Sequence, residues 1–217
     1  MGKKKHHKQD GALIRQPVGG LARAADWPVY EVLISRNWQE QGRIVTLLIA
    51  RRSSVTAKIA CASLLIDLGC LGVKSAQVKM FKDLAEYRSG MRMHVISLQP
   101  MEAASLDLAA KITYTGLNYA AALGFKPDAV FNQAEPLLSG AEPDACTVDV
   151  PTGGPEGKPL YVNGPYDDPR RIVDHLMRTL GPNNFHYVIQ GSPEDLGITD
   201  LVSRDDLEWK ALDEGQG

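Results

Sequence analysis

The chain has 217 residues, of which 44% are hydrophobic and 23% charged, and its net charge is −2. These values are typical of a globular protein, and the length is sufficient for one domain with a sizeable core. No run approaches eighteen uncharged apolar residues, which excludes a transmembrane helix, and no apolar signal segment follows the basic start. The three cysteines, Cys61, Cys70 and Cys146, lack the spacing of a disulfide framework and favour a reducing, cytoplasmic location.

The charge is distributed unevenly along the chain. Residues 1–24 have a net charge of +5, so the remaining residues carry −7, of which −6 falls after residue 191. Residues 1–25 also lack aromatic residues and regular apolar spacing. We therefore predict a disordered basic arm over 1–25, a single domain over 26–191 and an acidic C-terminal segment over 192–217.

Two runs with high β-propensity, Val29–Ser35 and Ile44–Arg51, open the predicted domain, and a third predicted strand, Lys58–Leu68, follows. The connections between them are short and polar, which predicts an antiparallel meander. Val73–Met80 is either a fourth strand or the start of a helix that ends near Arg88.

A helical middle section follows. Apolar residues at spacings of three and four predict a helix over Met101–Leu123, with Pro100 suited to its first turn and Gly124 to its left-handed C-cap. A second, short helix is predicted from Pro127 to Pro136, where the proline ends or bends it.

The last part of the domain is predicted to mix strands with one helix. The strands Cys146–Val150 and Pro159–Asn163 would form a hairpin around the loop PTGGPEGK, before a helix over Pro169–Leu180 and a strand over Phe185–Gln190. The predicted fold class is therefore α+β: an antiparallel meander, a helical middle section, then a β-hairpin, a helix and a strand, with disordered charged termini.

Three segments carry a resemblance to known sequences: DLGCLGVKSAQV (Asp67–Val78), ALGFKPDAVFNQA (Ala122–Ala134) and GKPLYVNGPYDDPRRI (Gly157–Ile172). They resemble a family of uncharacterised bacterial proteins with a CLGVKD turn, a helix ending in LGFKP and a GKPxYxxGPYD strand and turn. Ser75 stands where that family has aspartate. The resemblance spans most of residues 28–175 and implies a bacterial, cytosolic protein with one continuous domain. It implies no catalytic residue, because the family has no assigned activity.

One constellation suggests catalysis. Asp144, Glu156 and Lys158 match the loose pattern of restriction-type nucleases, in which two carboxylates hold a divalent cation and a lysine assists the attacking water. That fold places its glutamate and lysine on a strand, whereas the glycines and prolines here predict a turn. The same loop is no phosphate-binding P-loop, because three residues instead of four separate its glycines and a proline replaces serine or threonine.

Other reactive side chains have ordinary structural interpretations. Cys70 would be a thiol nucleophile beside a histidine, but a cysteine in an apolar run is usually a small buried hydrophobe. Asp168 before Pro169 is typical of a helix N-cap. His94, His175 and His186 are isolated and the sequence has no motif with metal-binding spacing, so we expect no metal and no cofactor, and His175 is predicted to lie at the surface.

A polar loop between the first two predicted strands is a candidate recognition site. Arg36, Asn37, Trp38 and Gln41 combine an aromatic ring with amides and a guanidinium, which suits stacking and hydrogen bonding. The alternative is that Trp38 folds back onto its hairpin.

The basic arm is a second candidate binding site. Lys3, Lys4, Lys5 and Lys8 would attract RNA, DNA or a ribonucleoprotein through counterion release, without reading sequence. We therefore predict a non-enzymatic cytosolic binding or accessory protein that contacts nucleic acid through its arm and no membrane. The alternatives are the metal-dependent nuclease-like hydrolase and a subunit of a larger assembly with a protein partner.

Overall fold

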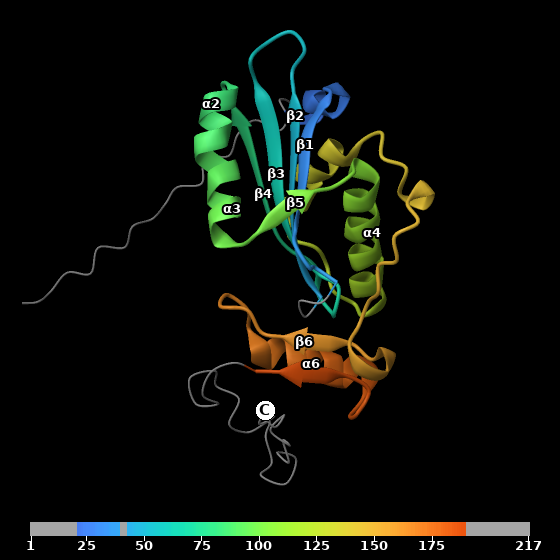
Figure 1. Ribbon diagram of the computed structural model, residues 1–217. Coiled ribbons are helices and arrows are strands. Elements are labelled where there is room, and N and C mark those ends of the chain that lie inside the picture. The colour runs from blue at the N-terminus through green and yellow to red at the C-terminus, as the bar shows by residue number, and fades with distance from the viewer. Residues whose placement is uncertain (1–20, 40–42, 190–217) are drawn as a thin grey trace, which may run out of the picture.

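A five-stranded antiparallel sheet forms the centre of the protein (Figure 1). The computed structural model describes residues 21–39 and 43–189, and its strand order is β4-β3-β2-β1-β5. The strands are β1 (Val29–Ser35), β2 (Ile44–Arg52), β3 (Ile59–Asp67), β4 (Gly72–Phe81) and β5 (Met101–Ala103). The predicted meander is thus confirmed, and the segment 73–80, left open between strand and helix, is part of a strand.

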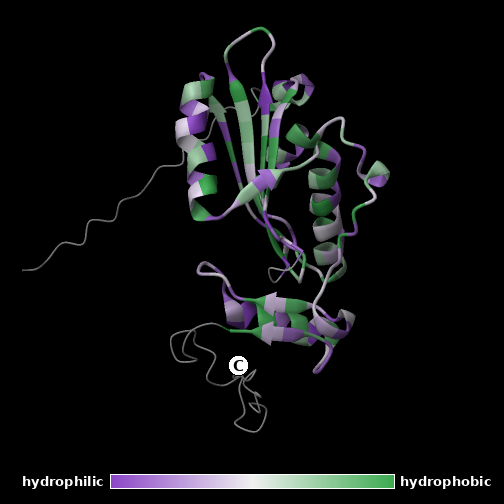
Figure 2. Cartoon of the chain, in the orientation of Figure 1, coloured by the Kyte–Doolittle hydropathy of each residue, from purple (hydrophilic) through white to green (hydrophobic). Residues whose placement is uncertain are grey.

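Helices cover both faces of the sheet (Figure 1). They are α4 (Leu106–Ala122) on one face, and α2 (Leu84–Tyr87), the π-helical segment η2 (Arg88–Arg92) and α3 (Met93–Leu98) on the other. Successive side chains of a strand point to opposite faces, so Leu47 packs in the cluster under α4 and Leu48 in the cluster under α2 and α3. Figure 2 shows hydrophobic and hydrophilic residues alternating around α2 and α3, as expected for helices that lie on a sheet.

The helix predicted over 101–123 begins five residues later than expected. Ser105 is the N-cap of α4, and its hydroxyl accepts a hydrogen bond of 3.0 Å from the amide of Leu108. The residues before it form the short strand β5, in which Ala103 pairs with Leu33 of β1. The apolar spacing typical of a helix therefore continues through residues 101–103, but the backbone of these residues pairs with β1 of the sheet.

The C-terminal part of the fold is a second, two-stranded sheet with one helix. Its elements are β6 (Leu160–Val162), α6 (Pro169–Leu180) and β7 (His186–Val188). The predicted helix over 169–180 is confirmed, but the predicted hairpin is wrong: residues 146–150 form no strand, and β6 pairs in parallel with β7. A parallel pair needs a crossover connection, which α6 provides.

Short helical turns connect these parts. They are η1 (Arg23–Asp26), α5 (Phe131–Ala134), η3 (Glu135–Leu138), η4 (Pro143–Ala145) and η5 (Pro155–Gly157). The helix predicted from Pro127 to Pro136 therefore begins later and continues past Pro136, which occupies the first turn of η3, where a proline needs no amide partner.

The C-terminal unit is joined to the main sheet at the turn after β3. The amide of Leu160 donates to the carbonyl of Gly69 at 3.0 Å, and the amide of Gly153 donates to that of Leu68 at 2.9 Å. A β-carbon on Gly69 would lie 2.5 Å from the carbonyl oxygen of Leu160, so only glycine permits this approach. A third hydrophobic cluster, which includes Tyr161, fills the space between this turn and α6.

The end of the predicted arm is folded. Leu21 and Ala24 are buried in the main core next to η1, so residues 21–25 are packed, while residues 1–20 lie outside the described part of the chain. Within the described ranges, no helix combines the length and apolar character needed to cross a membrane.

Candidate functional site

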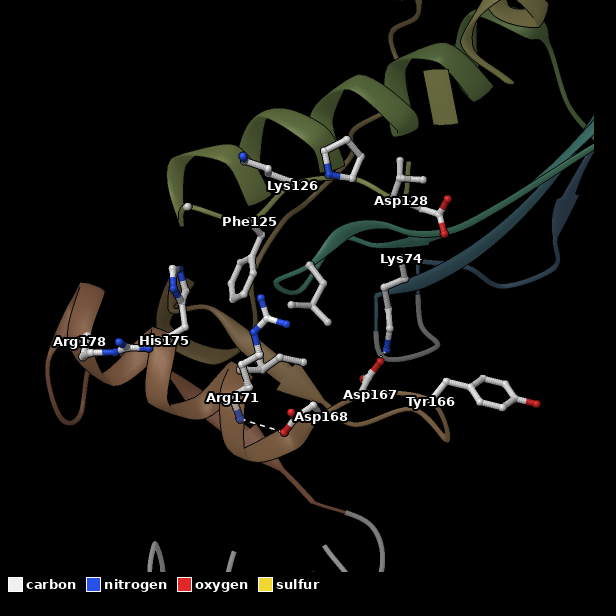
Figure 3. A pocket seen from close by; sticks show the side chains of 15 residues that line it. Lys74, Phe125, Lys126, Asp128, Tyr166, Asp167, Asp168, Arg171, His175 and Arg178 are labelled. Carbon is white, nitrogen blue, oxygen red and sulfur yellow. Dashed lines mark hydrogen bonds and ion pairs between the residues drawn. The ribbon is translucent and has the colours of Figure 1, made fainter. Parts of the chain in front are cut away.

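An open pocket of about 750 Å³ lies between the main sheet and the C-terminal unit (Figure 3). We call it the α6 pocket. Its wall comes from the start of β4, from the loop that follows α4, and from α6 with the turn that precedes it. Leu71, Val73, Phe125 and Ile172 supply an apolar floor, and charged side chains surround it.

The loop after α4 is shaped by its sequence. Gly124 has φ +84°, the left-handed conformation predicted for the C-cap, and the amide of Phe125 returns to the carbonyl of Ala120 at 2.9 Å. The ring of Phe125 then lies 4.6 Å from that of His175, centroid to centroid. His175 Nε2 donates to the carbonyl of Leu123 at 2.8 Å, so this histidine ties α6 to α4 instead of lying free at the surface.

A nearly buried ion pair closes one end of the pocket. Lys74 Nζ lies 2.7 Å from Asp167 Oδ2, and the two side chains are only 11% and 12% exposed. The same carboxylate oxygen accepts hydrogen bonds from the amide of Gly164 at 2.7 Å and from the hydroxyl of Tyr161 at 3.3 Å. The pair therefore fixes the turn before α6 against β4, and its charges neutralise each other.

Two further carboxylates at the pocket act as local caps. Asp168 accepts a hydrogen bond of 3.1 Å from the amide of Arg171, the N-cap predicted for α6, and Asp128 accepts one of 2.7 Å from the amide of Val130. Neither forms an ion pair with another described residue.

The other charged side chains that line the α6 pocket are three exposed cations, Lys126, Arg171 and Arg178. Figure 3 shows the guanidinium of Arg171 extending from α6 into the pocket, toward Phe125. Among the described residues, no carboxylate pairs with it. A planar guanidinium held at an apolar floor can bind a carboxylate or phosphate through two parallel hydrogen bonds.

A buried acid lies at the turn where the two sheets join. Asp67 Oδ1 accepts hydrogen bonds from the amides of Gly69 at 2.8 Å and Cys70 at 3.0 Å, while its Oδ2 is buried without a partner in the described structure. Burial raises the pKa of Asp67 from its ordinary 3.8 to about 6, although the nearby Lys74 ammonium opposes this rise.

The environment of Cys70 argues against a nucleophilic role. Its side chain is fully buried, and burial together with the nearby Asp67 raises the pKa of the thiol far above its ordinary value. The reactive thiolate is therefore disfavoured, and Cys70 packs as the small hydrophobe that the sequence suggests.

The three residues of the nuclease pattern do not form a common site. Lys158 and the exposed Glu156 pair with each other at 2.7 Å on the turn η5, and no strand carries them. Their loop approaches the hydroxyl of Tyr119, whereas the turn containing Asp144 is anchored to Asp107 in the first turn of α4. These anchors are about 18 Å apart along the helix, at about 1.5 Å per residue. Within the described ranges, no three histidine, cysteine, aspartate or glutamate residues are grouped to hold a metal ion.

The two binding sites proposed from sequence are only partly described. Arg36 and Asn37 are exposed, but Trp38 is only 6% exposed and packs in the main core, so its ring is not available for stacking. Gln41 and the arm lysines Lys3, Lys4, Lys5 and Lys8 lie outside the described residues.

The pocket residues Lys126 and Arg171 were not identified from sequence. The three segments on which the resemblance to other sequences was based, 67–78, 122–134 and 157–172, supply nearly all of the pocket wall. These segments could therefore have indicated the location of the pocket, although not the role of either residue. Comparisons with protein-family models, curated proteins and solved structures find no match to this chain.

Proposed function

We propose that the protein is a non-enzymatic binding protein and that the α6 pocket accepts an anionic ligand. The observation that supports this most directly is the guanidinium of Arg171, which extends into the pocket without a carboxylate partner in the described structure. The pocket volume of about 750 Å³ falls within the range of small-molecule sites.

The charge distribution around the pocket supports an anion over a cation as ligand. Lys74 and Asp167 neutralise each other, and Asp128 and Asp168 accept hydrogen bonds from backbone amides, which stabilise their negative charge locally. No carboxylate among the described residues neutralises the positive charge of Arg171. An anionic group of a ligand would neutralise it, while an apolar part of the same ligand would cover the apolar floor.

Binding is better supported than catalysis because the candidate acid–base groups already have structural partners. His175 holds the carbonyl of Leu123, and Asp167 holds Lys74 and the turn before α6. General acid–base catalysis needs a group within hydrogen-bond reach of the substrate whose protonation state is free to change.

The proposal includes a bacterial, cytoplasmic setting. Of the three free cysteines, Cys61 and Cys70 are buried on different parts of the fold, which suits a reducing compartment. The bacterial origin depends on the family resemblance. Contact with nucleic acid through Lys3–Lys8, and membership of a larger assembly, stay predictions.

Replacement of Arg171 tests the pocket. Arg171→Gln keeps a good helix former and the backbone amide that Asp168 caps. Its matched control is Arg52→Gln, which removes an exposed guanidinium from the last residue of β2, at the opposite end of the sheet from α6 (Figure 1). Isothermal titration calorimetry with inorganic tripolyphosphate measures the affinity of each full-length variant, in a background in which Lys3, Lys4, Lys5 and Lys8 are replaced by glutamine so that the arm does not bind the polyanion.

We expect Arg171→Gln to weaken tripolyphosphate binding about tenfold or more, because a hydrogen bond to a charged group contributes about 1.5–3 kcal/mol. Arg52→Gln should bind like the wild type. If the wild type binds no tripolyphosphate, or if both variants bind equally well, the α6 pocket is not an anion site.

A further inference from the structure

We infer that the natural occupant of the α6 pocket is a single-stranded nucleic acid, not an isolated small anion. This inference rests on the proposed function and narrows it to one class of ligand. It depends on the spread of the basic side chains along the pocket, on one exposed tyrosine, and on the position of the acidic caps.

The basic side chains form a row instead of converging on one point. Arg171 and Arg178 lie about two turns apart on one face of α6, with His175 between them, and all three line the pocket. His175 Nε2 is held by the carbonyl of Leu123, so the two arginines are the groups that phosphates can reach. The row spans about 10 Å at about 1.5 Å per residue. Lys126 lies on the opposite wall, in the loop after α4 (Figure 3). A single phosphate would engage one of these groups, whereas a chain of phosphates can engage several.

An exposed aromatic ring stands at the other end of the pocket. Figure 3 shows Tyr166 beyond the Lys74–Asp167 pair, with its ring extending away from the protein. Tyr166 is 98% exposed, the most exposed large hydrophobic side chain of the described fold. Its backbone is nevertheless fixed, because the neighbouring Asp167 is held by Lys74 and by the amide of Gly164. An uncovered ring on a backbone held in this way is a platform on which a base can stack.

The acidic caps influence which form of nucleic acid fits. Asp128 and Asp168 repel phosphates and so disfavour a backbone that passes directly over them, although Asp168 lies beside Arg171, whose amide it caps. Each carboxylate uses one oxygen for its cap, and the other can accept a hydrogen bond from the amino group of a base. Single strands expose the whole Watson–Crick edge of each base, which pairing covers in a duplex.

The remainder of the surface also favours a single strand over a duplex. The described fold contains nearly equal numbers of positive and negative side chains, so its net charge does not provide the general attraction for phosphates that a strongly basic duplex-binding domain has. A short basic row with one stacking ring corresponds to the combination that binds single strands without sequence preference.

The test separates stacking from charge. All proteins are full-length and carry Lys3, Lys4, Lys5 and Lys8 replaced by glutamine, so that the arm contributes no background binding. Fluorescence anisotropy measures the affinity for a labelled single strand of about ten nucleotides, within the site sizes of about 4–16 nucleotides known for such proteins. The variants are Tyr166→Ala, Tyr166→Phe and the control Val55→Ala. Val55 is 94% exposed in the turn between β2 and β3, at the far end of the sheet (Figure 1).

We expect Tyr166→Ala to weaken single-strand binding about fivefold or more, because stacking of one base contributes at least about 1 kcal/mol. Tyr166→Phe should retain wild-type affinity, as should Val55→Ala. Tripolyphosphate binding should not respond to Tyr166→Ala, because the ring contributes no charge. The log–log salt slope for the single strand should be about −2, because Lys126, Arg171 and Arg178 would each contribute about −0.7.

Tripolyphosphate binding that depends on Arg171 would overturn the inference and support the proposed function if the single strand binds no more tightly than tripolyphosphate and Tyr166→Ala leaves its affinity unchanged. Equal affinity for a duplex of the same length also overturns it. If neither tripolyphosphate nor the single strand binds, the proposed function itself fails.

Discussion

Replacing the buried Asp67 with asparagine should change how the stability of the protein depends on pH. In the wild type, burial raises the pKa of Asp67 from 3.8 to about 6, so the folded state holds a proton that the unfolded state releases between these two values. The free energy of unfolding therefore falls as pH rises from about 4 to above 6, and it loses nothing more from this group at higher pH. An asparagine side chain does not titrate, so the Asp67→Asn variant should lack this loss.

The size of the effect follows from the difference between the two pKa values. A shift of about two units corresponds to about 3 kcal/mol, at about 1.36 kcal/mol per unit. The asparagine oxygen can accept the hydrogen bonds from Gly69 and Cys70 that Asp67 Oδ1 accepts. Its amide nitrogen takes the place of Oδ2, which has no described partner, and this adds a constant cost of about 1–3 kcal/mol. The constant cost cancels when the two proteins are compared across pH.

Urea unfolding at several pH values between 4 and 8 gives the required comparison. The free energy of unfolding of Asp67→Asn minus that of the wild type should increase by about 2–3 kcal/mol between pH 4 and pH 7.5. Asp144→Asn is the matched control, since Asp144 is exposed on η4 and its difference from the wild type should stay nearly constant. A difference for Asp67→Asn that does not change with pH would refute the assignment of a raised pKa to this carboxyl.

Three further predictions concern other charged groups. Asp167→Ala should lower the free energy of unfolding by about 3 kcal/mol in urea titrations, because it leaves the nearly buried Lys74 unpaired. The double variant with Lys74→Met should recover at least about 1 kcal/mol, and equal losses in both variants would show that the unpaired Lys74 ammonium is not the cause. Glu156→Ala should shift the melting temperature by no more than a degree or two and remove no Mg²⁺-dependent nuclease activity, because Glu156 is exposed and paired only with Lys158. Deleting residues 1–20 should abolish weak, sequence-independent binding of duplex RNA whose log–log salt slope is about −3 to −4, and unchanged duplex binding by the shortened chain would place that contact on the folded part of the protein.

The sequence predicted the local structure best where one pattern acted alone. Runs of residues with high β-propensity and short joins predicted the meander, and Asp168 with Pro169 predicted the start of α6. The errors arose where tertiary pairing outweighs a local pattern. Met101–Ala103 fits the helical periodicity of α4, yet it pairs with β1, and the glycine-rich loop that suggested a hairpin connects no strand pair.

The parallel pairing of β6 with β7 was missed because the strand over 159–163 was paired with residues 146–150. The order strand, helix, strand is typical of parallel pairing, but β6 and β7 are only three residues long. The backbone bonds of Leu160 to Gly69 and of His186 to Pro159 fix the arrangement, and these link residues far apart in sequence. Their geometry requires the close approach at Gly69, which in the sequence is one glycine among twenty.

The pocket was hidden for a related reason. Arg171 and Arg178 lie on the polar face of an amphipathic helix, where charged residues are usually solvated, and Lys126 precedes a proline in an ordinary loop. Lys74 and Asp167 are 93 positions apart, so their pairing depends on how the C-terminal unit lies against β4. This pairing neutralises two of the charges at the pocket and leaves the guanidinium of Arg171 without a carboxylate in the described structure. The chemistry of the pocket is therefore a property of the contact between two units, and a scan for motifs within single segments does not reveal it.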